Sequence, residues 1–352
     1  MDLSETFARC FPGAGEGTSL GYNAAHEGAA LWDRSRWSLR ALPREAGLPF
    51  LHKFLTQDVA TLAPGQGRYA CCLSTKGGLK ADLWLYVGAE QVWLLCAPEA
   101  EESLYSHLGR YARLSRVAFE DLADSHAALS VWGPQAAAGL KGLSQGLRAG
   151  PDLPSEGEVA WGSEGGAPFA IARNDLAGVP GYDLLLPAAQ AQELVEALAA
   201  FGAQPLEGEA LDSLRIEAGL PLYGVDLDEK TIPIEAGLEA RAISYDKGCY
   251  TGQEVIARIK HRGKVNRHLR AFSFLERVDL PAPLFAGAKQ VGSVTTLASS
   301  PRLGGLIGLG LIHRKHLEAE LRAGSPEGPL VSLLKLPFAW AEGSFEVPAG
   351  DR

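Results

Sequence analysis

The sequence has no CxxC pair, and its five cysteines are Cys10, Cys71, Cys72, Cys96 and Cys249. Without spaced pairs, the pattern favours neither a disulfide scaffold nor a structural zinc site. Adjacent Cys71 and Cys72 would point to opposite faces of a strand, which makes them poor ligands for one ion. We therefore predict no metal site, and we expect the cysteines at 71, 72 and 96 to be small core residues.

Long apolar runs and a basic surplus are also missing. Nowhere do about 18 uncharged apolar residues follow one another, and the first nine residues include Asp2 and Glu5 instead of an apolar signal region. We expect no membrane partner and a cytoplasmic location. The formal net charge is −9, from 33 Lys and Arg against 42 Asp and Glu. This balance argues against nucleic acid as a partner, because such binding depends on neutralising phosphates.

Several nucleotide-binding and catalytic motifs are absent as well. We find no GxGxxG, Walker loop, HExxH or GxSxG, so nucleotide, zinc-protease and serine-hydrolase functions have no motif to support them. What is present is a chain of 352 residues of which 46% are hydrophobic. Because single cores stop growing at about 250 to 300 residues, this length predicts two or three packed globular domains.

The first two thirds of the chain mix helix and strand signals. Helical spacing predicts helices at 49–61, 99–114, 188–201 and 207–219, and β-prone runs predict strands at 69–74, 79–87, 91–96, 127–132, 169–173 and 182–186. Residues 146–166, rich in Gly, Pro, Ser and Glu, predict a surface loop. The last 85 or so residues instead alternate short strands with Gly and Pro. The whole pattern predicts an α+β protein with a small C-terminal β-barrel domain.

The densest polar cluster surrounds one cysteine. It begins with Lys247-Gly248-Cys249-Tyr250-Thr251-Gly252-Gln253-Glu254. Eight more basic or potentially basic residues follow, namely Arg258, Lys260, His261, Arg262, Lys264, Arg267, His268 and Arg270. Such a positive field would lower the pKa of an exposed Cys249 thiol and make it a better nucleophile or soft-metal ligand. We predict that Cys249 is an exposed functional cysteine.

Plainer interpretations of this cluster remain open. Residues 247–253 can be a turn that opens a helix around 255–259, with Cys249 buried and inert. The basic run can be a solvated surface, or it can hold a polyanionic ligand or partner.

Two aspartates stand in apolar strands. Asp82 lies among Leu79, Leu83 and Trp84, and Asp183 lies in Gly181-Tyr182-Asp183-Leu184-Leu185-Leu186. Since burying an unpaired carboxylate costs several kcal/mol, each must be hydrogen-bonded or have a raised pKa at a cavity. Together they could grip the N–C–N edge of a pterin, although Asp82 could also be a structural partner of an arginine.

The motifs resemble those of a known superfamily. Residues 247–254, with Ala257-Arg258 and Arg262-Gly263, are similar to the KGCYTGQE…AR…RG signature of YgfZ-type proteins. The wider chain resembles the superfamily that includes the glycine-cleavage T protein. The matching segments are Asp33-Arg34-Ser35 and residues 62–65, 76–83, 214–226, 232–237, 299–302 and 336–338.

This resemblance implies a three-domain cloverleaf around a central folate channel. The implied domains are 1–47 together with 128–250, then 48–127, and a β-barrel at 265–345. The implied cofactor is tetrahydrofolate or a one-carbon-substituted folate. Asp82 and Cys249 are the expected catalytic residues, and the expected cofactor-binding residues are Asp82, Asp183, Lys247, Tyr250, Gln253, Arg258 and Arg262. In T proteins an arginine precedes the Asp-Ser-Leu-Arg run, and here that position is Leu211.

The resemblance therefore predicts a monomeric, folate-binding accessory protein for iron-sulfur cluster assembly or repair. Its expected partners are a reduced folate and iron-sulfur assembly proteins or client enzymes. One alternative is a folate-dependent aminomethyltransferase like the T protein. Others are a different Cys249-dependent one-carbon transferase and a folate-sensing scaffold in which Cys249 is structural.

Overall fold

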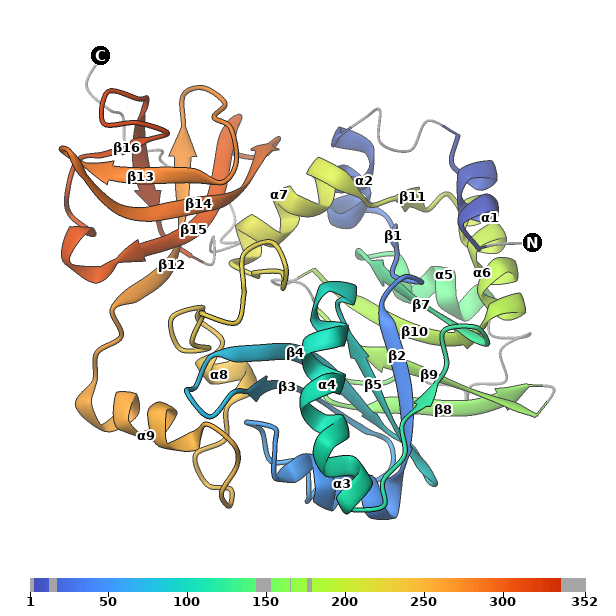
Figure 1. Ribbon diagram of the computed structural model, residues 1–352. Helices are drawn as coiled ribbons and strands as arrows, with labels where there is room; N and C mark the ends of the chain where they lie inside the picture. The colour runs from blue at the N-terminus through green and yellow to red at the C-terminus, as the bar shows by residue number, and fades with distance from the viewer. Residues whose placement is uncertain (1–2, 13–17, 144–152, 165, 176–178, 337–352) are drawn as a thin grey trace.

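The computed structural model describes residues 3–12, 18–143, 153–164, 166–175 and 179–336. Two sheets with their helices and a closed barrel make up the molecule, and Figure 1 shows the barrel beside the two sheets. The α+β class and the C-terminal β-barrel are confirmed. No helix in these ranges is long and apolar enough to cross a membrane.

The first sheet has six strands in the order β11-β1-β7-β10-β9-β8. Its strands are β1 (Ala30–Asp33), β7 (His126–Trp132), β8 (Val159–Glu164), β9 (Ala167–Arg173), β10 (Gly181–Pro187) and β11 (Gln204–Pro205). Its helices are α1 (Leu3–Cys10), α2 (Thr18–Glu27), α5 (Ala136–Leu143), α6 (Ala188–Phe201) and α7 (Gly208–Ala218). Apolar residues of α1, α5 and α6 cover one face of this sheet and form a separate core.

The second sheet has five strands in the order β3-β4-β5-β2-β6. Its strands are β2 (Ser38–Pro43), β3 (Gln66–Leu73), β4 (Leu79–Val87), β5 (Gln91–Cys96) and β6 (Glu120–Asp121), and its helices are α3 (Arg44–His52) and α4 (Pro98–Leu114). A shared core that includes Trp93 of β5 and Leu185 of β10 joins the two sheets. The division into domains stays a prediction, although β2 pairs here and not in the first sheet.

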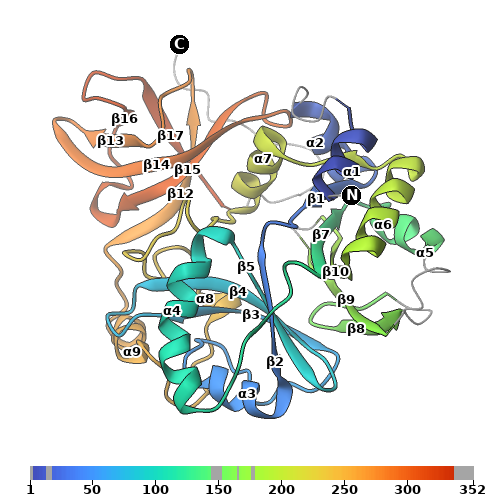
Figure 2. The same ribbon diagram turned by 45° about the vertical axis from the view of Figure 1, so that its right-hand side comes forward.

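The barrel closes in the order β12-β15-β14-β13-β16-β17. Its strands are β12 (Arg267–Phe274), β13 (Ala282–Ala286), β14 (Lys289–Ser300), β15 (Gly305–His313), β16 (Leu321–Ala323) and β17 (Leu330–Leu334). The short helix α8 (Glu239–Ala242) packs against β3 of the second sheet. The helix α9 (Gln253–Arg262) precedes the barrel in the chain, and the 3-10 helix η1 (Arg314–His316) follows β15. Figure 2 shows α7 lying between the barrel and the first sheet, and α7 indeed packs against both β14 and α2.

Local predictions were good where helical or alternating spacing was strong. Helix α6 has the predicted bounds, and α4 begins one residue earlier than predicted. The helix predicted at 49–61 was wrong for most of its length, because α3 spans Arg44–His52 and turns follow it. These turns still bury Leu55, Val59 and Leu62 in the core of the second sheet. The spacing of the apolar residues therefore predicted their burial correctly, although these residues do not form a helix.

Part of the chain predicted as a loop is also regular. Residues 159–164 form β8, which pairs with β9. Residues 146–152 and 165, which belong to the same prediction, lie outside the described residues.

Candidate functional site

A cavity of about 640 Å³ lies where the two sheets and the segment after α7 meet. Strands β3 and β4 form one wall, the ends of β9 and β10 form another, and α8 contributes residues to the rim. The polar and aromatic lining residues are Arg68, Tyr69, Trp84, Tyr86, Glu156, Glu158, Arg173, Asn174, Asp175, Asp183 and Arg241. The site thus draws on segments that are far apart in the sequence.

One wall owes its chemistry to the alternation of strand β4. Residues Asp82, Trp84 and Tyr86 project from the same face, because successive side chains of a strand point to opposite sides. The ring centroids of Tyr69 and Trp84 are 4.9 Å apart. The guanidinium carbon of Arg241 stands 4.9 Å from the centroid of Tyr69 and 5.8 Å from that of Trp84. The wall is therefore a pair of aromatic rings under a cation.

Asp82 lies behind this aromatic wall. Its Oδ2 accepts a 2.7 Å hydrogen bond from the Tyr69 hydroxyl. The residue as a whole is partly exposed, yet its Oδ1 is shielded from solvent and has no hydrogen-bond partner within the described part of the chain. Burial raises the pKa of the Asp82 carboxyl, against the lowering effects of the Tyr69 hydrogen bond and of the charges of Arg241 and Arg34. Asp82 is a carboxyl with one free acceptor.

Asp183, on β10, has the opposite environment. Its Oδ1 accepts hydrogen bonds from Arg34 (2.9 Å) and Ser130 (2.6 Å). Its Oδ2 accepts from Tyr86 (2.8 Å) and Asn174 (2.9 Å). Asp183 and Arg34 are 1% and 2% exposed, so this ion pair is fully buried. Four donors match the four acceptor positions of an ionised carboxylate, which leaves Asp183 no free lone pair.

The aromatic neighbours of Arg34 hold its guanidinium in place. The guanidinium carbon lies 3.9 Å from the ring centroid of Trp37 and 5.0 Å from that of Trp32. Its charge pairs with Asp183 and also acts on Asp82. Arg34 therefore pairs with one of the predicted aspartates and lies within electrostatic reach of the other.

The predicted cysteine site lies elsewhere. Cys249 is exposed, as expected, in the segment before α9, and it does not line the cavity. Lys247 is buried and does not serve the thiol, because its Nζ donates to the carbonyls of His52 (2.6 Å), Leu55 (2.6 Å) and Gln57 (3.1 Å). Burial lowers the pKa of Lys247 to about 8. The lysine caps the turns after α3.

The other predicted binding residues are also outside the cavity lining. Tyr250 is buried with its ring 4.9 Å from the Lys247 ammonium. Gln253 opens α9, and Arg258 forms an exposed ion pair with Glu254. The side chain of Arg262 lies outside the described part of the structure. Of the predicted residues, Asp183 lines the cavity, and Asp82 contacts the lining residue Tyr69 without lining the cavity itself.

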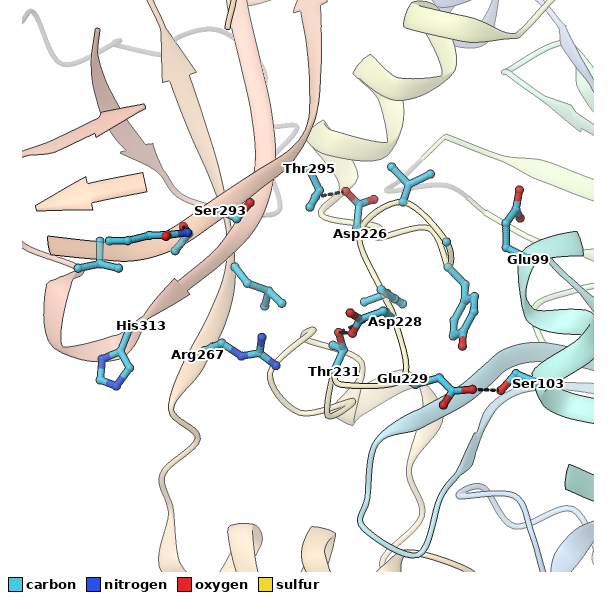
Figure 3. A pocket seen from close by; sticks show the side chains of 18 of the residues that line it. Glu99, Ser103, Asp226, Asp228, Glu229, Thr231, Arg267, Ser293, Thr295 and His313 are labelled. Atoms are coloured by element: carbon cyan, nitrogen blue, oxygen red, sulfur yellow. Dashed lines mark hydrogen bonds between the residues drawn. The ribbon is translucent and has the colours of Figure 1, made fainter. Parts of the chain in front are cut away.

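A second, larger cavity of about 1060 Å³ lies between the barrel and α4, and Figure 3 shows its lining. Most of its acids have partners. Asp226 accepts from Thr295 (2.6 Å) and Thr296 (2.6 Å) and pairs with Arg215 (2.8 Å). Glu229 accepts from Ser103 (2.6 Å). The ring pair in its lining is formed by His313 and His316, whose centroids are 6.0 Å apart. Because none of the described lining acids is both shielded and unpartnered, we take the smaller cavity as the candidate site.

Sequence reasoning missed several residues of the site. Alternation along β4 from Asp82 was a sufficient signal for Trp84 and Tyr86. Arg34 stood in a motif that was noted, yet its partner is 149 positions away. No local pattern indicates Arg241. Leu211, which replaces the expected arginine, is 8% exposed and packs in an apolar core that contains Tyr22.

Comparisons with known proteins show which family this chain resembles. Residues 11–247 match the family described as "GCVT N-terminal domain". A protein of Thermosynechococcus vestitus named aminomethyltransferase is 31% identical over 85% of this chain and 81% of its own length. Another of that name, from Geobacillus kaustophilus, is 32% identical over 83% of this chain and 81% of its own.

A solved structure shows the same fold. The crystal structure of glycine cleavage system aminomethyltransferase T from Bartonella henselae matches with a TM-score of 0.81 and 24% identity. The match covers 92% of this chain and 90% of that chain.

These relatives contradict the predicted role in iron-sulfur cluster assembly or repair. They are named aminomethyltransferases, so the alternative prediction agrees with them better, and the expected iron-sulfur partners lose their support. The YgfZ-type assignment is not confirmed. The prediction gave the cluster around Cys249 a functional meaning, whereas Lys247 stabilises backbone turns and Arg258 pairs with Glu254.

Proposed function

The chain belongs to the GCVT N-terminal domain family, and from this premise we propose that it is a folate-dependent aminomethyltransferase. The cavity between the two sheets is its active site. The observation that carries the proposal is the shielded Oδ1 of Asp82, which lacks a partner behind an aromatic wall. A buried acceptor of this kind costs free energy unless a ligand or a proton satisfies it.

The cavity fits a reduced folate in size and chemistry. Its volume of about 640 Å³ lies within the range of about 300 to 1,000 Å³ that is usual for small-molecule sites. Tyr69 and Trp84 offer aromatic surface to a flat heterocycle. The free Oδ1 of Asp82 can accept a hydrogen bond from a ring nitrogen. Bound there, the folate supplies the nitrogen that accepts the one-carbon unit.

Asp82 has the properties of a residue that holds and moves a proton. Burial raises the pKa of the Asp82 carboxyl and so brings it closer to neutral pH than the pKa of an ordinary aspartate. A group whose pKa lies near the operating pH can both donate and accept a proton efficiently. The Tyr69 hydroxyl fixes the orientation of the carboxyl through Oδ2 and leaves Oδ1 without a partner in the described structure. The charges of Arg34 and Arg241 oppose the effect of burial and keep the ionised form accessible.

Asp183 contributes by positioning. Saturated by four donors, it fixes Tyr86 and Asn174, both of which line the cavity. It thereby holds the cavity wall in one arrangement. The pterin contact expected of Asp183 would need one of these donors to give way to a ligand.

The proposal is tested by measuring binding and turnover together. We expect tetrahydrofolate to bind in calorimetry, and we expect ammonia release when a lipoyl carrier loaded with the aminomethyl group is added. Replacing Asp82→Asn should lower the rate by about 100-fold or more, because a positioned acid or base contributes that much to catalysis. Absence of tetrahydrofolate-dependent ammonia release from the native protein would refute the proposal.

A matched variant separates the site from general effects of charge. Asp124 is exposed and does not line the cavity. Asp124→Asn makes the same chemical change and should leave folate binding and rate unchanged. An equal loss in both variants would mean that Asp82 has no special role.

A further inference from the structure

Asn174, which follows β9, is held in place through both its backbone and its side chain. Its backbone N–H donates to the carbonyl of Gly181 at 2.9 Å, and its backbone carbonyl accepts from the Trp132 Nε1 at 2.9 Å. Its side-chain Nδ2 donates to the Oδ2 of Asp183 at 2.9 Å. The amide therefore has a fixed position in the wall of the cavity between the two sheets, which Asn174 lines.

The Oδ1 of Asn174 is the polar atom that these contacts leave over. It has no hydrogen-bond partner in the part of the chain that the structure describes, and it is not among the shielded atoms there. An ionised carboxylate can only accept hydrogen bonds, so Asp183 must face the nitrogen end of the amide. The carbonyl end consequently turns away from Asp183 and is left to accept from a ligand in the cavity.

Asp183 itself cannot accept from a ligand while its four donors stay in place. Arg34 and Ser130 donate to its Oδ1, and Tyr86 and Asn174 donate to its Oδ2. Displacing one of the buried donors would leave that donor unpaired, which costs free energy. A ligand that needs an acceptor at this end of the cavity meets the Asn174 carbonyl without that cost.

Asn174 and Asp82 lie toward opposite ends of the aromatic wall. On one face of β4, Asp82 precedes Trp84 and Tyr86 follows it. At about 3.3 Å for each residue of a strand, the Cα atoms of Asp82 and Tyr86 are about 13 Å apart. Asn174 donates to the same oxygen of Asp183 as Tyr86 and so belongs to the Tyr86 end. A flat heterocycle stacked on the wall therefore has an acceptor beyond each of its ends.

We propose that Asn174 is a specificity-determining residue whose Oδ1 accepts a hydrogen bond from the exocyclic amino group on the pyrimidine ring of a reduced folate. The assignment rests on the proposed function and adds a residue to its substrate recognition. An amide carbonyl accepts from an N–H group and cannot pair with another carbonyl, so Asn174 selects a ring that carries an amino group at this position. A ring without the donor would leave the oriented carbonyl without a partner in the complex.

The experiment compares the Kd of tetrahydrofolate with that of its analogue that carries hydrogen in place of this amino group. The native protein should bind the analogue about tenfold more weakly, since the analogue lacks one hydrogen bond at an acceptor that water can still reach. The variant Asn174→Leu keeps a branched side chain without polar atoms, and its preference should fall below about twofold. Measuring two ligands on two proteins isolates this contact, because changes that affect both ligands equally cancel.

The matched control is Tyr86→Phe. Like Asn174→Leu, it removes one donor to the Oδ2 of Asp183, so the two variants should lose similar amounts of unfolding free energy. It leaves the Asn174 amide in place, and it should therefore keep the preference for the amino-substituted ring within about twofold of the native value. If Tyr86→Phe abolishes the preference and Asn174→Leu keeps it, the Tyr86 oxygen is the acceptor and the assignment is wrong.

Two further outcomes separate this assignment from the proposed function. If the native protein binds tetrahydrofolate and the analogue with equal affinity, the assignment of Asn174 is overturned and the folate cavity stands. If neither ligand binds, the proposed function fails and the assignment falls with it.

Discussion

Two aspartates of the same cavity region, the buried Asp183 and the partly exposed Asp82, differ in how completely their carboxylates are satisfied. Asp183 accepts four hydrogen bonds, one of them from the buried Arg34. Asp82 accepts one, from Tyr69, and its Oδ1 has no partner in the described structure. Asp183 therefore maintains the structure, and Asp82 is free to take part in chemistry. The sequence alone does not separate them, because both lie in similar apolar strands.

Removing the charge of Asp183 should have the largest effect on stability. In Asp183→Asn, Arg34 remains buried without its counter-ion, and breaking a buried pair in this way costs about 3 to 5 kcal/mol. The free energy of unfolding from urea titrations measures the loss. Glu254→Gln, which breaks the exposed pair with Arg258, should cost at most about 0.5 kcal/mol. Similar losses of unfolding free energy in the two variants would show that the buried ion pair is no more important for stability than the exposed one.

The substitution Asp82→Asn should increase the free energy of unfolding at neutral pH, whereas Asp183→Asn should decrease it. Burial raises the pKa of Asp82, so the folded protein keeps this proton after the unfolded chain, with a pKa of about 3.9, has lost it. Stability therefore falls as pH rises from about 4 to the raised pKa of the folded state. The asparagine variant lacks this loss, and it should be at least as stable as the native protein above that window.

The effect of Asp82 is measured as the difference in unfolding free energy between the native protein and the Asp82→Asn variant. Glu217 also has a pKa raised by burial, so both proteins share its contribution to the pH dependence. Subtracting the unfolding free energies of native protein and variant at each pH isolates Asp82. A difference that does not change between pH 4 and 8 would show that the Asp82 carboxyl is not perturbed.

Substitutions of the two tyrosines that donate to these aspartates should have smaller effects on stability, and they test the difference between Asp82 and Asp183 further. Tyr69→Phe removes the one hydrogen bond of Asp82, which should cost about 1 kcal/mol and raise the pKa of Asp82 further. The pH window described above should then extend upward. Tyr86→Phe removes one of four donors to Asp183 and should leave that window unchanged. An equal shift of the window in both variants would mean that the window does not report the hydrogen bond between Tyr69 and Asp82.

The sequence predicted some features of the site better than others. Asp82 was predictable, because an acid in a strand of apolar residues must have a partner or face a cavity. Its partner Tyr69 lies on β3, which pairs with β4, and a strand was predicted in each of these two regions. The pair of Arg34 and Asp183 joins positions 149 apart and depends on the packing of β1, β7 and β10. Local spacing carries no information about such a contact.

The region around Lys247 shows the limit of motif reasoning. A dense basic motif predicted a charged field at Cys249, yet the Lys247 ammonium is used by three carbonyls of residues 52–57. The same contact explains why residues after His52 need no helix, because a side chain supplies donors that a helix would otherwise provide. The Lys247 side chain thus explains why the predicted helix is absent, and it lies outside the cavity lining.

Cys249 provides the smallest expected effect. It is exposed and absent from the cavity lining, so Cys249→Ser should change the Kd for folate and the transfer rate by less than about twofold. Alkylation followed by mass spectrometry should label Cys249 ahead of Cys72 and Cys96, whose pKa values burial raises to about 12. A tenfold or greater loss of rate in Cys249→Ser would place a reacting group outside the cavity. The contrast between the two aspartates would then no longer be enough to locate the chemistry.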